Sequence, residues 1–394
     1  MNTVRGMRLR WREVAVIALS LALAWGLRGQ HGHERGSAIV GAMAGLGFAA
    51  VTGGSRWIAS AVIGSLSFAI GGSLSYGRFV HLAYQGSLEA ILSLALIGFA
   101  WGGLGSLGLG LGLALTRYRT WERITVAGGL FFVWFVIDRL LWVKMEGPQD
   151  LYTRELMALV LLGAWAFLCA YVGVWRGDRT SLKLALAGGI GFGIGFPLAA
   201  WIQGMGNSTG VALDWWKVAE HVIGLLGGVS LALAAKRMES SWTLPQAVRP
   251  WERWLAVVWL LWFLPSWLVA NNLDYWITER AWFPVITGKI VWGILFLLLI
   301  GFAVWAWQEI RCGRIFVTSW LPRHLRRLFL TFVWITTVIA CSKTLVEKIW
   351  NPTPLVFVLL ALLITWLVQT SRTAISLVAG IGPATPESSP SSSR

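Results

Sequence analysis

Cysteine is scarce in this sequence, with three residues in a chain of 394. They are Cys169, Cys312 and Cys341, and no two of them form a C-x-x-C pair. This spacing excludes a disulfide framework and a thiolate metal site. Two of the three fall inside apolar stretches, where cysteine packs as a small apolar side chain.

Charged residues are also few. They make up 13% of the chain, whereas a soluble protein carries roughly a quarter. Apolar residues reach 56%, and they recur in stretches of about twenty, the length at which a helix crosses roughly 30 Å of hydrocarbon. No segment between these stretches is long enough to fold alone. The composition therefore predicts one all-α polytopic membrane domain, since lipid requires helices to satisfy their own backbone.

Acidic residues are outnumbered by basic ones, 18 against 33, which gives a net charge of +15. Such a charge is typical of nucleic-acid-binding proteins. Here the basic residues are spread over many short loops, as membrane topology requires, and do not form one patch. We therefore expect membrane lipids as the surroundings and no nucleic acid as a partner.

Catalytic and cofactor signatures are missing as well. The sequence has no Walker A motif, no G-x-S-x-G elbow, no H-E-x-x-H and no G-x-G-x-x-G that follows a strand. The glycine run from Gly102 to Gly112 lies inside an apolar stretch and lacks the context of a phosphate-binding loop. We expect no cofactor and no metal.

About a dozen apolar stretches are present, and we interpret each as a membrane-spanning helix. The first resembles a secretory signal, with four arginines before it and Ala22-Leu23-Ala24 near its end. An uncleaved span is the better interpretation, because further apolar segments follow without a soluble domain. The predicted spans lie near residues 13–28, 36–54, 57–77, 87–115, 122–143, 155–175, 181–203, 214–235, 252–272, 281–308, 325–347 and 354–380.

The basic residues predict the orientation. With the N-terminus in the cytoplasm, about two thirds of the Lys and Arg residues fall on the inner side, as the positive-inside rule expects. Both termini are then cytoplasmic, with a basic segment 1–12, a transmembrane domain 13–380 and a Pro/Ser-rich disordered tail 381–394. The bacterial cytoplasmic (inner) membrane is the expected location.

A weak internal repeat divides this domain. Residues 13–115 and 122–236 form a candidate parallel repeat of four helices each, whereas residues 252–380 are a Trp/Leu-rich four-helix segment. Chance agreement between glycine-rich helices is the alternative. Glycines at small-x-x-x-small spacing predict close packing of the first eight helices and leave oligomerisation open. The repeat rests on the ungapped alignment of Gly64, Phe68, Ile70, Gly71 and Leu74 with Gly188, Phe192, Ile194, Gly195 and Leu198.

Charged side chains within apolar segments need an explanation, because an unpaired charge in hydrocarbon costs several kcal/mol. The strongest signal opens the eighth span, where Asp214, Lys217 and His221 share one helix face and Glu220 lies one turn from Lys217. Asp214 suits the helix N-terminus. Glu220 and His221 lie deeper, and we predict that they handle a proton.

Two further segments carry candidate binding residues on the predicted outer side. The connection between the first two spans contains Arg28, His31, His33 and Arg35, which suit an anion or a proton, although a solvated loop is the alternative. The second group is Arg78, His81, Glu89 and Arg139, with Asp138, Lys289, Lys343 and Glu347 as residues that could join it. Ion pairing and snorkelling explain any one of them. Taken together they predict a polar pocket below the outer rim of the bilayer.

The leading hypothesis is a transporter or permease for a small polar, anionic solute, coupled to a proton. Arg28, Arg35, Arg78 and Arg139 would bind the anion in this hypothesis. The alternative is a membrane-embedded transferase with an extracytoplasmic site for a lipid-linked or glycan substrate, which the outward position of the polar residues favours. A third hypothesis is an accessory subunit of a membrane complex. The sequence alone does not separate them.

Overall fold

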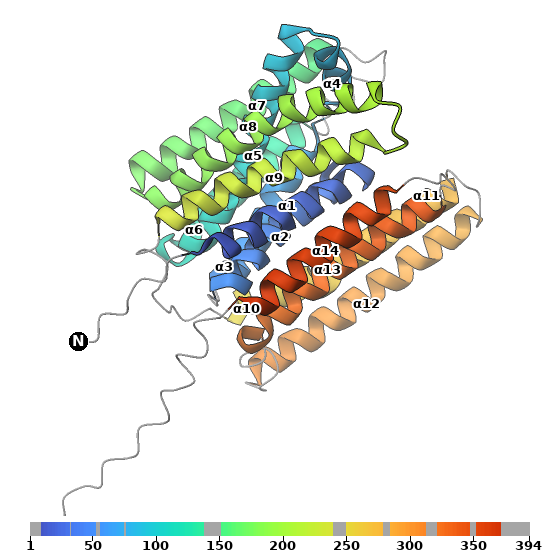
Figure 1. The fold of residues 1–394 in the computed structure, drawn as a ribbon. Coiled ribbons are helices and arrows are strands. Elements are labelled where there is room, and N and C mark those ends of the chain that lie inside the picture. Colours follow the sequence, from blue (N-terminus) through green and yellow to red (C-terminus); the bar gives the residue numbers. More distant parts are fainter. Residues whose placement is uncertain are drawn as a thin grey trace, which may run out of the picture.

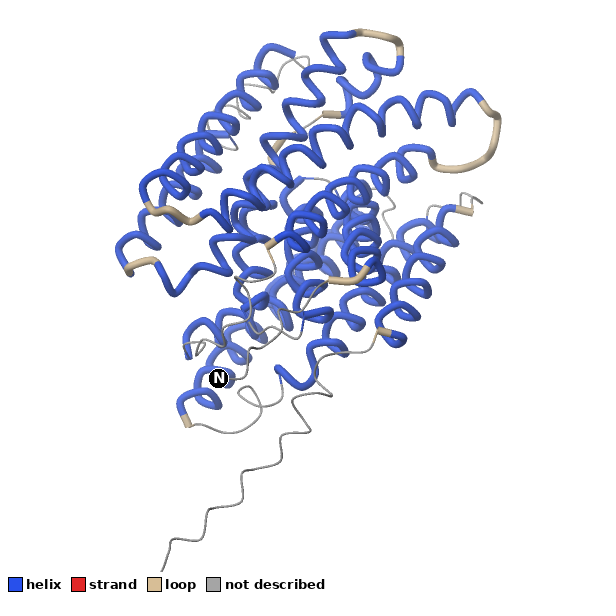
Figure 2. Tube along the Cα trace, turned by 60° about the vertical axis from the view of Figure 1, so that its left-hand side comes forward, coloured by secondary structure: helices blue, strands red, loops and turns tan. Residues whose placement is uncertain are grey.

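The structure, a computed structural model, describes residues 9–371 apart from 32, 53–55, 75, 138–150, 239–249, 279–283, 313–320 and 347–351. Within these ranges every regular element is helical, and the long helices run roughly along one common direction (Figure 1). Short loops join many of them (Figure 2). This is the arrangement that the apolar stretches predict.

The first half of the chain contains α1 (Trp11–His31), α2 (His33–Thr52), α3 (Arg56–Gly72), α4 (Gly77–Tyr84), α5 (Leu88–Ala114), η1 (Leu115–Arg117), α6 (Thr120–Phe135) and α7 (Leu151–Ala170). The second half contains η4 (Tyr171–Trp175), α8 (Arg179–Ser208), α9 (Trp215–Arg237), α10 (Pro250–Val258), η6 (Trp259–Phe263), α11 (Leu264–Thr278), α12 (Val285–Arg311), α13 (Leu321–Val346) and α14 (Thr353–Thr370). The segments η4 and η6 are π-helical turns that continue α7 and join α10 to α11.

Eight of the described helices are long and apolar enough to cross a membrane, and a ninth span results if α3 and α4 are counted as one broken span. The chain is therefore an all-α integral membrane protein. The prediction of twelve spans is not established by this criterion, because α1, α6 and the α10–η6–α11 segment do not pass it. The predicted span 57–77 is interrupted: α3 ends at Gly72, and α4 leaves it at an angle of 67°.

Local sequence explains how several helices begin. The side chain of Ser87 accepts a hydrogen bond from the Ala90 backbone N–H at 3.2 Å and caps α5. Asp178 caps α8 and Asp214 caps α9 in the same way. Such caps satisfy backbone donors that have no partner within the helix. The caps therefore fix where these three helices start.

Glycines allow the helices of the first half to approach closely. A Cβ added at Gly41 would lie 2.2 Å from the carbonyl carbon of Gly64, and one added at Gly45 would lie 2.4 Å from the Cα of Ala61. These contacts bring α2 against α3 with almost no side chain between them. Small residues at this spacing permit such an approach in lipid. The close packing predicted for these helices is thus observed at the α2–α3 contact.

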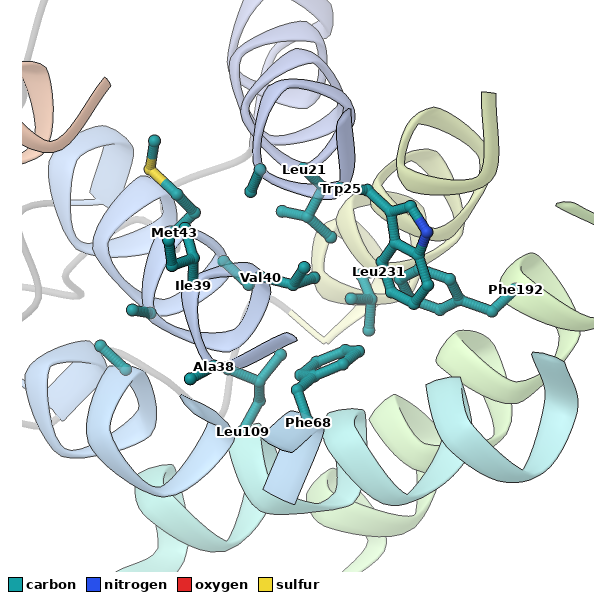
Figure 3. Packing of buried hydrophobic residues seen from close by; sticks show 14 of the residues in the cluster. Leu21, Trp25, Ala38, Ile39, Val40, Met43, Phe68, Leu109, Phe192 and Leu231 are labelled. Atoms are coloured by element: carbon teal, nitrogen blue, oxygen red, sulfur yellow. The ribbon is translucent and has the colours of Figure 1, made fainter. Parts of the chain in front are cut away.

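Buried aromatic side chains from α1, α3, α5 and α8 pack together in the interior of the bundle. Trp25 lies against Phe192 of α8, with Phe68 of α3 close by (Figure 3). By contrast, α12 lies at the edge of the molecule and exposes Ile290, Ile294 and Leu297 (Figure 1). An apolar helix that is exposed on this scale faces lipid.

Candidate functional site

Arg28, Tyr76 and Glu220 form a buried polar cluster between α1, the break before α4, and α9. The Arg28 Nη1 atom lies 3.3 Å from Glu220 Oε1. Nη1 also donates a hydrogen bond to the Tyr76 hydroxyl, which in turn donates to Glu220 Oε1. The three residues are 5%, 2% and 1% exposed, respectively. A charge pair this deep needs such hydrogen bonds to offset its loss of hydration.

Aromatic rings surround the guanidinium group of Arg28. Its Cζ lies 4.5 Å from the centre of the Tyr76 ring and 4.7 Å from that of Trp101. A cation is attracted to the face of such rings, and more strongly where water is excluded. Trp216 stacks on Tyr76 with a centroid distance of 5.8 Å. The rings therefore hold Arg28 in place and shield it.

Beyond the cluster, toward the middle of the bundle, the space is filled by aromatic packing. Trp25 lies 4.8 Å from Phe192 and 5.2 Å from Trp101 between ring centres. Phe196 packs against Trp101 and Tyr76 at 5.9 and 4.7 Å. Trp25 and Phe192 lie next to each other in this packing (Figure 3). The rings therefore form an apolar layer beside the charged cluster.

His221 follows Glu220 on α9 and is buried beside it. Its Nδ1 atom lies 2.6 Å from the carbonyl oxygen of Lys217. A carbonyl oxygen can only accept, so Nδ1 carries the hydrogen, and the neutral ring then has its lone pair on Nε2. Nε2 is buried and has no hydrogen-bond partner. His221 can therefore accept a proton at that atom.

Two glycines of α1 provide the space that Glu220 and His221 occupy. A Cβ added at Gly26 would lie 2.4 Å from His221 Cε1. One added at Gly29 would lie 2.7 Å from Glu220 Cγ. A larger residue at either position would force α1 and α9 apart or displace the side chain of His221 or Glu220. The segment Trp25-Gly26-Leu27-Arg28-Gly29 thus supplies Arg28 as the partner of Glu220. It also leaves the space that the side chains of Glu220 and His221 fill.

The N-terminus of α9 leads from the surface to this cluster. Lys217 Nζ lies 3.1 Å from Asp214 Oδ2, and the Lys217 side chain is buried. The Asp214 backbone N–H donates to Thr353 Oγ1 at 3.2 Å, which connects this point to α14. Phe357 of α14 packs on the ring of His221, with centroids 4.6 Å apart. Four predicted residues, Asp214, Lys217, Glu220 and His221, therefore follow one another from the surface inward.

Three polar atoms in this cluster have no hydrogen-bond partner although they are buried. Leaving such groups unsatisfied costs about 1–3 kcal/mol each, and more for charged ones. A site with unused donors and acceptors can take up a ligand or a proton without first breaking those bonds. The atoms are Arg28 Nε, Glu220 Oε2 and His221 Nε2.

The other predicted site residues lie apart from the buried cluster or outside the described ranges. Arg35 is half-buried in the first turn of α2. Arg78, His81 and Glu89 have exposed side chains on α4 and α5, where His81 contacts the Tyr84 hydroxyl through Nδ1. Lys289 is exposed on the peripheral α12. The side chains of His31, His33 and Lys343, and all of Asp138, Arg139 and Glu347, are outside the description. One cavity that joins all of them stays a prediction.

Three members of the cluster were not singled out from the sequence: Tyr76, Trp25 and Trp101. Trp25 and Trp101 have the same appearance as interfacial anchors, of which the chain has many candidates among its 27 tryptophans. A sequence feature next to Tyr76 could have identified it. It follows Gly71-Gly72-Ser73, a run that helices tolerate poorly, and so marks a break at which a side chain can turn inward.

A second polar network lies at the opposite end of the bundle, where η1 connects α5 to α6. Glu122 is buried and lies 3.1 Å from Arg176 Nη1. The Tyr118 hydroxyl donates to Asp178 Oδ2 at 2.9 Å, and the Ser181 hydroxyl donates to the same oxygen at 2.6 Å. Burial raises the pKa of Tyr118 well above its usual range, and the Asp178 carboxylate raises it further. Both carboxylates have direct partners, as expected of a structural network.

Among the described residues no group of three or more His, Cys, Asp or Glu side chains could hold a metal ion. In comparisons with known proteins, no family model matches the chain, and no curated protein or solved structure matches it significantly. The class of the protein therefore follows from its fold and site alone. It is an all-α integral membrane protein with a charged cluster buried among its helices.

Proposed function

We propose that this protein is a proton-coupled transporter of a small anionic solute, with Arg28, Tyr76 and Glu220 as its binding site. The observation that carries the proposal is the buried ion pair between Arg28 Nη1 and Glu220 Oε1 at 3.3 Å. In this pair the protonatable carboxylate of Glu220 occupies the guanidinium at which an anion would bind. The carboxylate and the anion therefore compete for Arg28. This competition supplies a physical mechanism for coupling.

The coupling follows from charge balance. While Glu220 is ionised, its carboxylate neutralises Arg28. An incoming anion near Arg28 would add a second negative charge to a buried site, which is strongly unfavourable. If Glu220 takes up a proton, the anion can replace it as the partner of Arg28 and the total charge is unchanged. Anion and proton would therefore bind together and leave together.

Tyr76 adjusts the hydrogen bonds during this exchange. Its hydroxyl accepts from Arg28 and donates to Glu220 in the structure. A hydroxyl can rotate its hydrogen toward a different acceptor. Once Glu220 is protonated, Tyr76 is free to donate to the bound anion. Charge-assisted bonds of this kind are the strong ones in anion recognition.

His221, one residue deeper on α9, is proposed to exchange the proton with Glu220. Its Nε2 lone pair is unused, and it stands one residue beyond Glu220 on the helix whose N-terminus holds Asp214 and Lys217. An imidazole can accept a proton at one ring nitrogen, so His221 suits a relay. Asp214 and Lys217 are proposed to line the entrance.

Alternating access requires the layer of aromatic rings beside the charged cluster to open toward the cytoplasmic side. Trp25, Trp101 and Phe192 come from α1, α5 and α8, so a relative movement of these three helices would expose the cluster inward. In the full proposal twelve spans place both termini in the cytoplasm of a bacterial cell, and α1, α6 and α10–η6–α11 are spans as well. The positive-inside bias supports this orientation.

The test is transport in proteoliposomes that enclose a pH-sensitive dye. Phosphate, sulfate, lactate, succinate and glutamate are added outside in turn, with an ionophore present to clamp the membrane potential. For at least one of these anions we expect internal acidification that requires the protein. Glu220→Gln should abolish anion-driven acidification, because the carboxylate that takes the proton is gone. Glu309→Gln, a half-buried acid near the end of the peripheral α12, serves as the matched control and should transport like the parent chain.

The result that would overturn the proposal is acidification that persists at full rate in Glu220→Gln. Absence of acidification with every anion, together with a lipid-linked sugar found by mass spectrometry of protein purified in native lipids, would instead support the membrane-embedded transferase. The accessory-subunit hypothesis predicts neither activity nor a bound sugar, but a stable partner protein in the same purification.

A further inference from the structure

A long apolar groove runs along the side of α3, apart from the buried cluster. Its volume is about 780 Å³, within the usual range for small-molecule sites. One wall is α3, from Ala59 past Leu66 to Ile70. The facing walls are α6, through residues such as Leu130, and the π-helical turn η6, through Trp259. Apolar side chains dominate the lining between the two ends.

Charged residues lie at the two ends of the groove. Glu34 and Arg35 are at the end near α4, and Arg123 is at the end near η1. Along α3, the stretch from Ala59 to Ile70 rises about 17 Å at 1.5 Å per residue. Half of a bilayer's hydrocarbon thickness is about 15 Å. The apolar part of the groove therefore matches the depth of a single leaflet.

Two arginines, Arg56 and Arg117, lie just beyond the η1 end of the groove lining. Arg56 begins α3, one turn before Ala59, and its Nε and Nη2 atoms are buried without a hydrogen-bond partner. Arg117 is close enough to repel it electrostatically. Arg56 also sits at a helix N-terminus, where the macrodipole disfavours a cation. An anion placed between Arg56 and Arg117 would relieve all three penalties at once.

We infer that this groove is a binding site for one anionic phospholipid. The phosphate would lie at Arg56 and Arg117, with Arg123 at the mouth, and an acyl chain would follow α3 toward Ile70. Arginine holds phosphate with two parallel hydrogen bonds, which suits the unused donors of Arg56. In the proposed topology this end faces the cytoplasmic leaflet, where anionic lipids are concentrated. The site is independent of the transport proposal.

The experiment measures the thermal unfolding midpoint of the full chain in detergent, with added phosphatidylglycerol, phosphatidylcholine or inorganic phosphate. We expect phosphatidylglycerol to raise the midpoint in a saturable way. Phosphatidylcholine has the same chains without net charge, and phosphate has the charge without chains. Neither should reproduce the increase at equal concentration. An equal increase with either one would overturn the inference.

Two pairs of variants locate the site. Arg56→Gln combined with Arg117→Gln should lose the response to phosphatidylglycerol, whereas Arg237→Gln, an exposed arginine at the end of α9, should keep it. Ala127→Trp fills the groove from α6 and should also lose the response. Thr125→Trp adds the same bulk to another face of α6, outside the lining, and should keep it.

The Ala127→Trp and Thr125→Trp variants still test the inference if the Arg56→Gln/Arg117→Gln protein fails to fold. Ala127 and Thr125 are both exposed, so neither substitution disturbs the core. A full phosphatidylglycerol response in Ala127→Trp, or in a folded Arg56→Gln/Arg117→Gln protein, would contradict a lipid in this groove.

Discussion

The ring of His221 lies directly against the backbone of Gly26, so closely that a Cβ on Gly26 would be 2.4 Å from His221 Cε1. The contact joins α1 to α9 at the depth of the buried cluster. It means that the α1 backbone is part of the wall around His221 and Glu220. Small changes in α1 should therefore act directly on the charged site.

Gly26→Ala tests this relationship. Real Cβ contacts are not this short, so α1 and α9 must separate or His221 must change rotamer. We expect a loss of about 1–3 kcal/mol in stability, as for overpacking in other cores. The measurement is the thermal unfolding midpoint in one detergent. Gly128→Ala on α6 is the matched control, because nothing lies near its added Cβ, and it should be neutral or slightly stabilising. Equal midpoints for the two variants would contradict the predicted packing.

A double-mutant cycle on Arg28 and Glu220 tests whether the pair acts as a unit. Either Arg28→Gln or Glu220→Gln alone leaves one buried charge without its partner, which costs about 3–5 kcal/mol. The double variant removes both charges and should be less damaging than the sum of the single ones. Unfolding midpoints of the four proteins give the coupling. Additive losses would show that the two charges do not interact.

Close packing of α2 on α3 is tested by Gly41→Val. The added Cβ would overlap the Gly64 backbone, which cannot rotate away as a side chain could. We expect this variant to express poorly or to lose most of its thermal stability. Gly301→Val on the peripheral α12 is the control, since the space around that Cβ is open. A normal unfolding midpoint for Gly41→Val would exclude the helix contact.

Tyr118 gives a prediction about alkaline pH. Its pKa is raised by burial and by the Asp178 carboxylate, so the folded protein keeps the hydroxyl protonated above pH 10. Unfolded chains ionise near the ordinary tyrosine pKa of about 10. Stability from this residue is therefore fully present below that pH and falls as the pH rises above it. The parent chain should lose stability at alkaline pH more steeply than Tyr118→Phe.

The comparison is made from unfolding midpoints of both proteins between neutral pH and pH 11. At neutral pH Tyr118→Phe should be less stable by about 1 kcal/mol, because Asp178 loses one hydrogen bond and keeps Ser181. Parallel pH profiles for the two proteins would argue against a shifted Tyr118.

The polar residues of α9 show which parts of the site the sequence predicts. Asp214 was expected at a helix N-terminus and caps α9, and Glu220 and His221 were expected deeper and are buried. Helical periodicity predicts the relative positions of these three residues along α9. The partner of Glu220 is different, because Arg28 is 192 residues away and no local pattern pairs the two. Tyr76 entered the site because α3 stops at Gly72, which hydropathy did not reveal.

The sequence by itself determined that the chain is an all-α membrane protein, because each apolar stretch must satisfy its own backbone in lipid and helices do so locally. It also determined which side chains would be costly to bury. Only the tertiary structure decided which of these meet: Arg28 with Tyr76 and Glu220, and Arg56 with Arg117 beside the groove. Those neighbours depend on which helix faces pack together, and in this protein the packing is set by glycine contacts between distant segments.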